Sequence, residues 1–306
     1  MQVNKNSRIT DGLDEQKKGG TVFSLTVLII VLVSFVFSAI LLTVQNSGTN
    51  VFETEWYRYL SYSLNGIVIL FALAFSKHLF KEGNFARFCR IEKTESKYYF
   101  YAVLALVATF FGFGKINGFF IDFLQNNFGY KVDVLVLPEF SPISYILVTL
   151  TVCVLPAVAE ELLFRGAIIG DFEEGNIVVY GLIGGFLFSI FHMNPAQTPY
   201  QFTVGFTFTV LAIKSKSVLP TILAHFLNNF IIINVEFFAP NLLNFGVTWD
   251  IIVSILGIVC FAFFLFLILK GREKKEKQPL KIKGFLLSSA VGVSICLLMW
   301  FTNFFS

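Results

Sequence analysis

Residues 143–170, ISYILVTLTVCVLPAVAEELLFRGAIIG, are apolar over a length that can cross a bilayer, yet they contain two adjacent carboxylates and an arginine. A membrane-spanning helix needs about 20 predominantly apolar residues. Inserting one ionised residue at the centre of such a helix costs ~2.5–3.5 kcal/mol. The pair Glu160 and Glu161 therefore needs a reason, and chemistry performed within the bilayer is the reason that we favour.

The whole chain has the composition of a membrane protein. Of its 306 residues, 56% are hydrophobic and only 14% are charged, whereas soluble domains carry roughly 25% charged residues. Backbone polar groups in hydrocarbon must be satisfied within their own segment, so long apolar runs predict helices. The predicted fold is all-α, a polytopic membrane helix bundle with about eight to nine transmembrane helices. The apolar runs are roughly 21–44, 57–76, 98–121, 143–170, 177–193, 199–213, 218–236, 250–270 and 284–302.

The charge pattern predicts the domain organisation and the orientation. Residues 1–20 form a polar tail, and 21–306 form a single transmembrane domain with its catalytic core at about 143–236. Lysine and arginine crowd the tail and the connectors at 77–97 and 271–283. Basic connectors stay in the cytoplasm, which places the N-terminus there. We interpret the lysine-rich connector as topogenic or lipid-facing and expect no nucleic-acid partner.

The four cysteines are scattered and show no CxxC spacing. This pattern makes a disulfide framework or a thiolate zinc site improbable.

The first polar motif separates the two glutamates. Glu161 and Arg165 are four residues apart, so on a helix they share a face and can pair. Glu160 points about 100° away and has no local partner, which suggests a general base. Pro156 removes one backbone hydrogen bond a turn earlier, which could bend the helix and admit water. The alternative is a buried Glu–Arg pair that only fixes helix packing, but it leaves Glu160 unexplained.

Two further motifs lie in later apolar runs. Phe188 and His192 are four residues apart, and His192 alone could be an ordinary interfacial side chain. His225 and Asn229 share one helical face, with Asn228 beside them. An imidazole and an amide in this arrangement can bind a metal-held water or donate to a developing oxyanion. The alternative is a polar contact between membrane helices.

The order EExxxR, FxxxH and HxxxN on three predicted helices resembles the CAAX-protease and bacteriocin-processing (CPBP, Abi) family of intramembrane proteases. The resemblance covers about residues 143–236, and EELLFRG is the form of the first motif typical of the family. It implies an intramembrane endopeptidase acting on membrane-associated peptides or proteins. Bacterial members are linked to bacteriocin maturation or self-immunity and to peptide-pheromone processing.

The resemblance implies six catalytic residues, in three pairs. Glu160 with His192 would activate the attacking water. His225 with Asn229 would stabilise the tetrahedral intermediate, and Glu161 with Arg165 would support the site.

Whether a metal takes part stays open at this point. Glu160, His192 and His225 would make a three-ligand Zn²⁺ site with an open fourth position. A metal-free version with Glu160 as the base uses the same residues. Two imidazoles and one carboxylate favour a divalent metal slightly.

The depths of the two histidines present a difficulty. If the fifth run begins near residue 177, His192 lies ~22 Å above its cytoplasmic end, whereas His225 lies only ~10 Å above the start of its own run. To meet, the fifth helix must tilt or enter the bilayer late, near Gly181 to Gly185. The site therefore predicts such a distortion.

Two other functions compete with proteolysis. One is a catalytically idle membrane partner or regulator, and the other is an ion-coupled transporter, which the lack of a detectable inverted repeat disfavours. The composition, rich in Phe and Lys, hints at a low-GC bacterium and hence at a bacterial plasma membrane. A peptide precursor or a membrane protein is then a more plausible substrate than a prenylated one.

Overall fold

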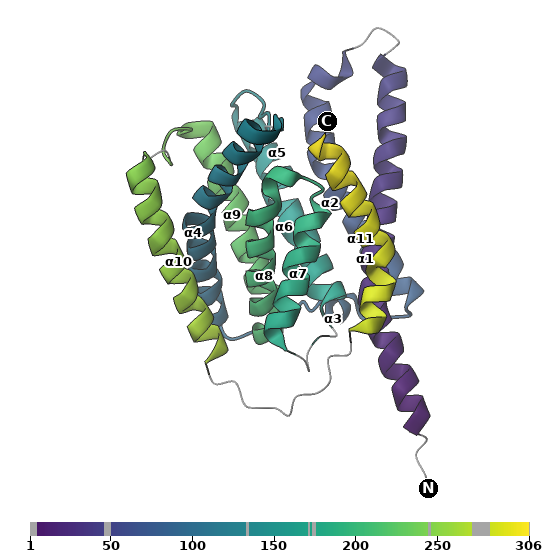
Figure 1. The fold of residues 1–306 in the computed structure, drawn as a ribbon. Helices are drawn as coiled ribbons and strands as arrows, with labels where there is room; N and C mark the ends of the chain where they lie inside the picture. The colour runs from purple at the N-terminus through teal and green to yellow at the C-terminus, as the bar shows by residue number, and fades with distance from the viewer. Residues whose placement is uncertain are drawn as a thin grey trace.

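The computed structural model shows a bundle of helices (Figure 1), and within its described residues there is no strand. The all-α prediction is confirmed. The acidic residues Asp171, Glu173 and Glu174 and most of the lysine-rich connector, 271–281, lie outside the described part of the chain. That part comprises residues 5–45, 50–132, 135–170, 172, 176–243, 246–270 and 282–305.

All nine predicted apolar runs are helical. Seven are long and apolar enough to cross a membrane by length and composition, which makes the chain an integral membrane protein. They are α1 (Lys5–Gln45), α2 (Glu55–Leu79), α4 (Ser96–Phe128), the composite helix Pro142–Ile168, α9 (Leu219–Phe238), α10 (Val247–Leu269) and α11 (Lys283–Phe304). The other two are shorter, α7 (Ile177–Phe191) with 15 residues and α8 (Thr198–Ser215) with 18.

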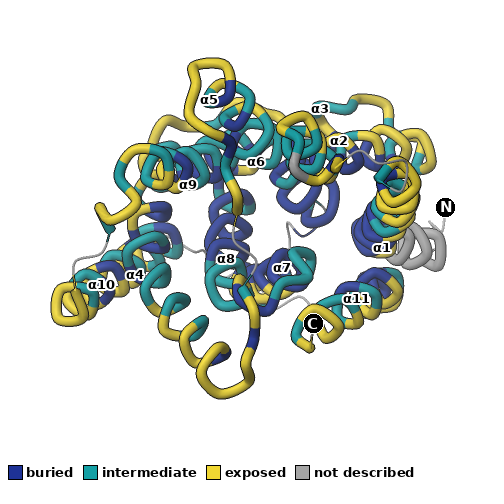
Figure 2. The backbone as a smooth tube through the Cα atoms, turned by 90° about the horizontal axis from the view of Figure 1, so that it is seen from above, coloured by how far each residue is buried: buried dark blue, intermediate teal, exposed yellow. Residues whose placement is uncertain are grey.

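The bundle has a buried centre flanked by two helix pairs. Helices α4 and α10 pack together on one side, and α1 packs with α11 on the other (Figure 1). Between them stand α7, α8, α9 and the composite helix, and the buried backbone is concentrated along α7 and α8 (Figure 2). The helices that carry the three polar motifs therefore form the middle of the molecule.

Helices α7 and α8 form a short, tightly packed hairpin. A Cβ at Gly185 would lie 2.8 Å from the carbonyl oxygen of Phe202, and one at Gly205 would lie 2.9 Å from the Cα of Gly185. Helix α7 is continuous, with no break near Gly181 to Gly185, and these glycines serve close packing. A tilt of this helix or its late entry into the bilayer stays a prediction. The hairpin ends below the tips of the neighbouring helices (Figure 1), so its shortness sets the depth of His192.

The composite helix Pro142–Ile168 is irregular in the region of the first motif. It runs through α5 (Pro142–Val148), the π-helical segment η2 (Thr149–Val154), α6 (Leu155–Glu161) and the π-helical segment η3 (Leu162–Ile168). Single π-helical turns inside α-helices occur frequently at functional sites. Pro156 stands two residues after the end of η2, so the helix is irregular a turn before this proline. The predicted bend and the entry of water stay predictions.

The basic connectors meet at one end of the bundle, as a consistent orientation requires. The short helix α3 (Phe85–Phe88) lies at this end. The hydroxyl of Thr94 donates to the carbonyl of Ser215 over 2.8 Å, which joins two connectors. Lys18 near the N-terminus pairs with Glu82 at 2.6 Å. Two short 3₁₀ turns, η1 (Val51–Glu53) and η4 (Pro195–Gln197), occur in other connectors.

Candidate functional site

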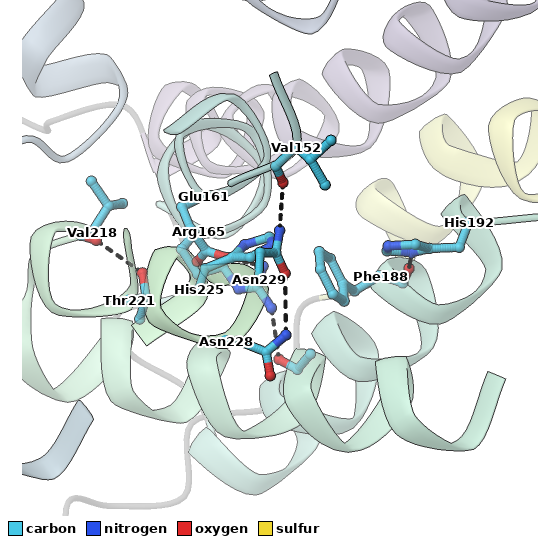
Figure 3. A network of polar contacts seen from close by, with 11 residues as sticks. Val152, Glu161, Arg165, Phe188, His192, Val218, Thr221, His225, Asn228 and Asn229 are labelled. Carbon is cyan, nitrogen blue, oxygen red and sulfur yellow. Dashed lines mark hydrogen bonds and ion pairs between the residues drawn. The ribbon is translucent and has the colours of Figure 1, made fainter. Parts of the chain in front are cut away.

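Glu161, Arg165 and His225 form a buried ionic cluster between the composite helix and α9 (Figure 3). Arg165 Nη1 donates to Glu161 Oε1 over 2.8 Å, and both side chains are fully buried. His225 Nδ1 lies 2.9 Å from the same oxygen. The predicted pairing of Glu161 with Arg165 is confirmed, and the cluster also includes a histidine 60 residues further along the chain.

Aromatic rings surround the Arg165 guanidinium. Its central carbon lies 4.3 Å from the ring centroid of Phe188 and 5.6 Å from that of Phe208. Its Nη2 also donates to the carbonyl of Gly205 over 3.3 Å. Cation–π contacts are strongest where the cation is desolvated. Arg165 thus holds the composite helix against both helices of the α7–α8 hairpin.

Glu160 has a different environment from its neighbour. It makes no hydrogen bond or ion pair with the described residues, and its buried Oε2 has no partner there. It interacts electrostatically with both Arg165 and His192. The second oxygen of Glu161 also lacks a partner, but its first oxygen binds two cationic or imidazole groups. A buried carboxylate oxygen without a hydrogen bond is costly, and a bound water or substrate group would satisfy it.

His192 lies at the end of α7, one turn beyond Phe188. Its Nδ1 is 2.7 Å from the carbonyl oxygen of Phe188, and the two rings meet edge to face at 4.8 Å. Because a carbonyl only accepts, Nδ1 carries the hydrogen and Nε2 of the neutral ring keeps a free lone pair. The ring is therefore prepared to accept a proton through Nε2.

Phe188 stands between His192 and the ionic cluster (Figure 3). Its ring lies 6.1 Å from the ring of His225, centroid to centroid. The same reasoning assigns the Nδ1 hydrogen of His225, because Glu161 accepts it. A protonated His225 would carry a second N–H at Nε2, and the Glu161 carboxylate would stabilise this cation, as the carboxylate of a hydrolase triad does.

Asn229 contacts the backbone that Pro156 disturbs. A proline has no N–H to donate to the carbonyl four residues earlier, which here is that of Val152. The Asn229 amide nitrogen donates to this carbonyl over 3.0 Å (Figure 3). Asn228 Nδ2 donates to Asn229 Oδ1 over 3.1 Å, and the hydroxyl of Tyr200 donates to Asn228 Oδ1 over 2.6 Å. The amide is therefore held from both ends.

Tyr200 takes part in this hydrogen-bond network, although no sequence motif indicated it. It stands near the start of α8, 28 residues before Asn228, and no helical spacing links the two. The role of Val152 could not be predicted either, because only its backbone takes part. Such contacts depend on how helices pack, which local patterns do not encode.

The three predicted metal ligands do not assemble in this structure. No group of three or more His, Cys, Asp or Glu among the described residues has a geometry that could hold a metal ion. His225 turns its Nδ1 to Glu161, and the Phe188 ring separates His225 from His192. We therefore derive no chemical step through a metal.

Residues 142–231 match the family model described as type II CAAX prenyl endopeptidase Rce1-like. The matched segment runs from the start of α5 into α9 and contains all three polar motifs. It confirms the resemblance that these motifs indicated. Neither a curated protein nor a solved structure matches the chain.

Proposed function

We propose that this protein is an intramembrane endopeptidase with Glu160 as its general base, because residues 142–231 match the Rce1-like family model of type II CAAX prenyl endopeptidases. The unpartnered, buried oxygen of Glu160 is the observation that supports this most directly. It lies in electrostatic range of His192, whose Nε2 lone pair is free. A carboxylate and an imidazole so placed can share the proton of one water.

In the proposed reaction, Glu160 and His192 bind the water and Glu160 takes its proton. The water oxygen attacks the carbonyl carbon of the scissile peptide bond and forms a tetrahedral oxyanion. Protonated His225, stabilised by Glu161, donates to that oxyanion together with the amide of Asn229. The intermediate then collapses, the C–N bond breaks, and the proton on Glu160 passes to the leaving nitrogen.

Arg165 supports this chemistry without touching the reacting atoms. Its charge stabilises the ionised form of Glu161, and its contacts with Phe188 and Gly205 fix the α7–α8 hairpin. The hairpin carries His192, so the ionic cluster sets the position of the imidazole relative to Glu160. A metal-dependent version would need Glu160, His192 and His225 to converge, and treatment of the purified protein with a chelator tests it.

An apolar cavity near the site suits a membrane-associated substrate. It has a volume of about 640 Å³ and includes Ser189 and Ile190 of the last turn of α7, next to His192. Phe113, Phe202 and Trp300 line its other walls. We assign the apolar part of the substrate to this cavity. A peptide precursor, such as a bacteriocin or pheromone precursor, or a membrane protein is the substrate class that we propose.

The basic end of the bundle faces the cytoplasm in this proposal, in a bacterial plasma membrane. Lys18, Lys97 and Lys214 lie at that end, and cytoplasmic connectors of membrane proteins carry such an excess of lysine and arginine. His225 lies two turns from the same end of α9. The scissile bond would therefore be reached from the cytoplasmic half of the membrane.

The test compares membranes from cells that express the wild type, Glu160→Gln or the exposed control Glu139→Gln. New peptide termini are mapped by mass spectrometry, and a quenched fluorescent peptide that spans a mapped cleavage site is assayed on purified protein. Cleavage that is present in the wild type and in Glu139→Gln but absent in Glu160→Gln supports the proposal. Equal cleavage in all three proteins refutes it, and a cellular phenotype that persists without any cleavage points to an idle binding partner.

A further inference from the structure

We propose that Tyr200 is a positioning residue, which fixes the amide of Asn229 through Asn228. The three side chains form a chain of hydrogen bonds from α8 across α9 to the composite helix. Asn228 is buried, and Tyr200 and Asn229 are half-buried. The inference deepens the proposed function, because Asn229 is one of the groups assigned to the oxyanion.

The carbonyl of Val152 sets the direction in which these hydrogen bonds run. A carbonyl only accepts, so Asn229 must present its nitrogen to Val152 and its oxygen to Asn228. Asn228 then presents its nitrogen to Asn229 and its oxygen to Tyr200, whose hydroxyl donates over 2.6 Å. Turning either amide over would place oxygen against oxygen or nitrogen against nitrogen. The orientation of both amides is thereby determined.

The hydroxyl of Tyr200 closes the chain at its free end. Without it, Asn228 Oδ1 loses its donor and the Asn228 amide has one restraint fewer. A primary amide carries two N–H groups, and Val152 uses one of those on Asn229. The second N–H is the one available to a substrate oxyanion, and its direction depends on how firmly the amide is held.

The protein contains a matched control for the hydrogen bond between Tyr200 and Asn228. The hydroxyl of Tyr145 donates to Asn234 Oδ1 over 3.0 Å, so a second tyrosine–asparagine pair involves α9. The nitrogen of Asn234 donates to the carbonyl of Phe230 in its own helix, so this pair does not reach Asn229. Tyr145→Phe thus removes the same kind of bond without touching the proposed relay, which is the set of hydrogen bonds from Tyr200 through Asn228 to Asn229.

The kinetic test measures hydrolysis of the reporter peptide that spans a mapped cleavage site, by purified wild type, Tyr200→Phe and Tyr145→Phe. We expect kcat of Tyr200→Phe to fall roughly tenfold, well short of the 10²–10³ typical for removal of an oxyanion donor, with KM within about twofold. Tyr145→Phe should keep the wild-type kcat. Equal kcat values for the two variants overturn the positioning role, as does a change confined to KM.

A thermal double-mutant cycle tests the relay without relying on activity. If Tyr200 acts on Asn229, the Tm losses of Tyr200→Phe and Asn229→Ala will not add in the double variant. The losses of Tyr145→Phe and Asn229→Ala should add, since independent sites are additive. Additive losses in both cycles overturn the relay. Glu160→Gln, assayed alongside, separates the two proposals, because retained hydrolysis there refutes the function while the cycle still decides the relay.

Discussion

Glu160 and Glu161 are adjacent in the chain, yet they belong to two different regions of the molecule. Glu161 lies in a buried cluster, where Arg165 and His225 bind one of its oxygens and aromatic rings cover the guanidinium. Glu160 interacts electrostatically with His192 and has no hydrogen bond or ion pair with the described residues. One helical step of about 100° separates a carboxylate with structural partners from one without.

This difference teaches how a membrane protein can keep a reactive carboxylate. A buried charge is tolerated when it is paired, and removing one member of such a pair is strongly destabilising. The Glu161 cluster satisfies that rule and holds the helices together. The same helix can then present Glu160, which makes no hydrogen bond or ion pair with the described residues. The proposed function thus assigns stability to Glu161 and reactivity to its neighbour Glu160.

The largest expected effect comes from neutralising Glu160. Glu160→Gln keeps the shape of the side chain but cannot take a proton, and general acid–base groups contribute about 10²–10⁴ in rate. We expect kcat to fall by that factor while Tm changes by less than about 2 °C, the size of a minor surface effect. Reporter hydrolysis and differential scanning fluorimetry measure the two quantities. A large loss of Tm would mean that Glu160 is structural and would abolish the contrast with Glu161.

Glu161→Ala should show the opposite pattern, a large loss of stability. It leaves the buried Arg165 without its carboxylate, and breaking a buried pair costs about 3–5 kcal/mol. The control is Glu95→Ala, which breaks the exposed pair of Glu95 with Lys97 (67% and 49% exposed), worth about 0–1 kcal/mol. Thermal unfolding in detergent compares the two variants. Similar Tm values for both would show that the cluster does not hold the helices together.

Much of this contrast could be predicted from the sequence, because it depends on helical spacing. The i,i+4 relation gave the Glu161–Arg165 pair, and the lack of such a partner singled out Glu160. The nine apolar runs gave the helices for the same reason, since length and hydropathy are local properties. The contacts of His225 with Glu161 and of Asn229 with Val152 join segments 64 and 77 residues apart. Only the packing of the helices brings these together.

Gly166→Ala should disturb the cluster from the end of the bundle where the basic connectors meet. A Cβ at Gly166 would lie 2.6–2.9 Å from backbone atoms of Cys89, and overpacking of this kind costs about 1–3 kcal/mol. Gly118→Ala in α4 is the control, since nothing lies within 4 Å of the added methyl group and a helical alanine gains about 0.5–1 kcal/mol. We therefore expect Tm to fall in the first variant and to rise slightly in the second.

The thiol of Cys89 reports the same disturbance. Burial raises its pKa to about 12, so at pH 8 almost none of it is the reactive thiolate. If the added methyl group displaces the connector between α2 and α4, which contains Cys89, alkylation of Cys89 by a maleimide becomes faster in Gly166→Ala than in Gly118→Ala. Equal, slow alkylation in both would show that the connector adapts without opening, and the close approach would then be of little consequence.

The smallest expected effect concerns Pro156 and Asn229, and it asks why the composite helix is irregular beside Glu160. Asn229→Ala removes the side-chain donor to the carbonyl of Val152, which costs about 0.5–1.5 kcal/mol. Pro156→Ala supplies an N–H that can donate to the same carbonyl. In that background Asn229→Ala should therefore cost less, by about 1 kcal/mol, a coupling of the size seen between residues that share a partner. Chemical unfolding of the four proteins in the cycle measures it. An unchanged cost would mean that Asn229 does not compensate for the proline, and the irregularity beside Glu160 would need another cause.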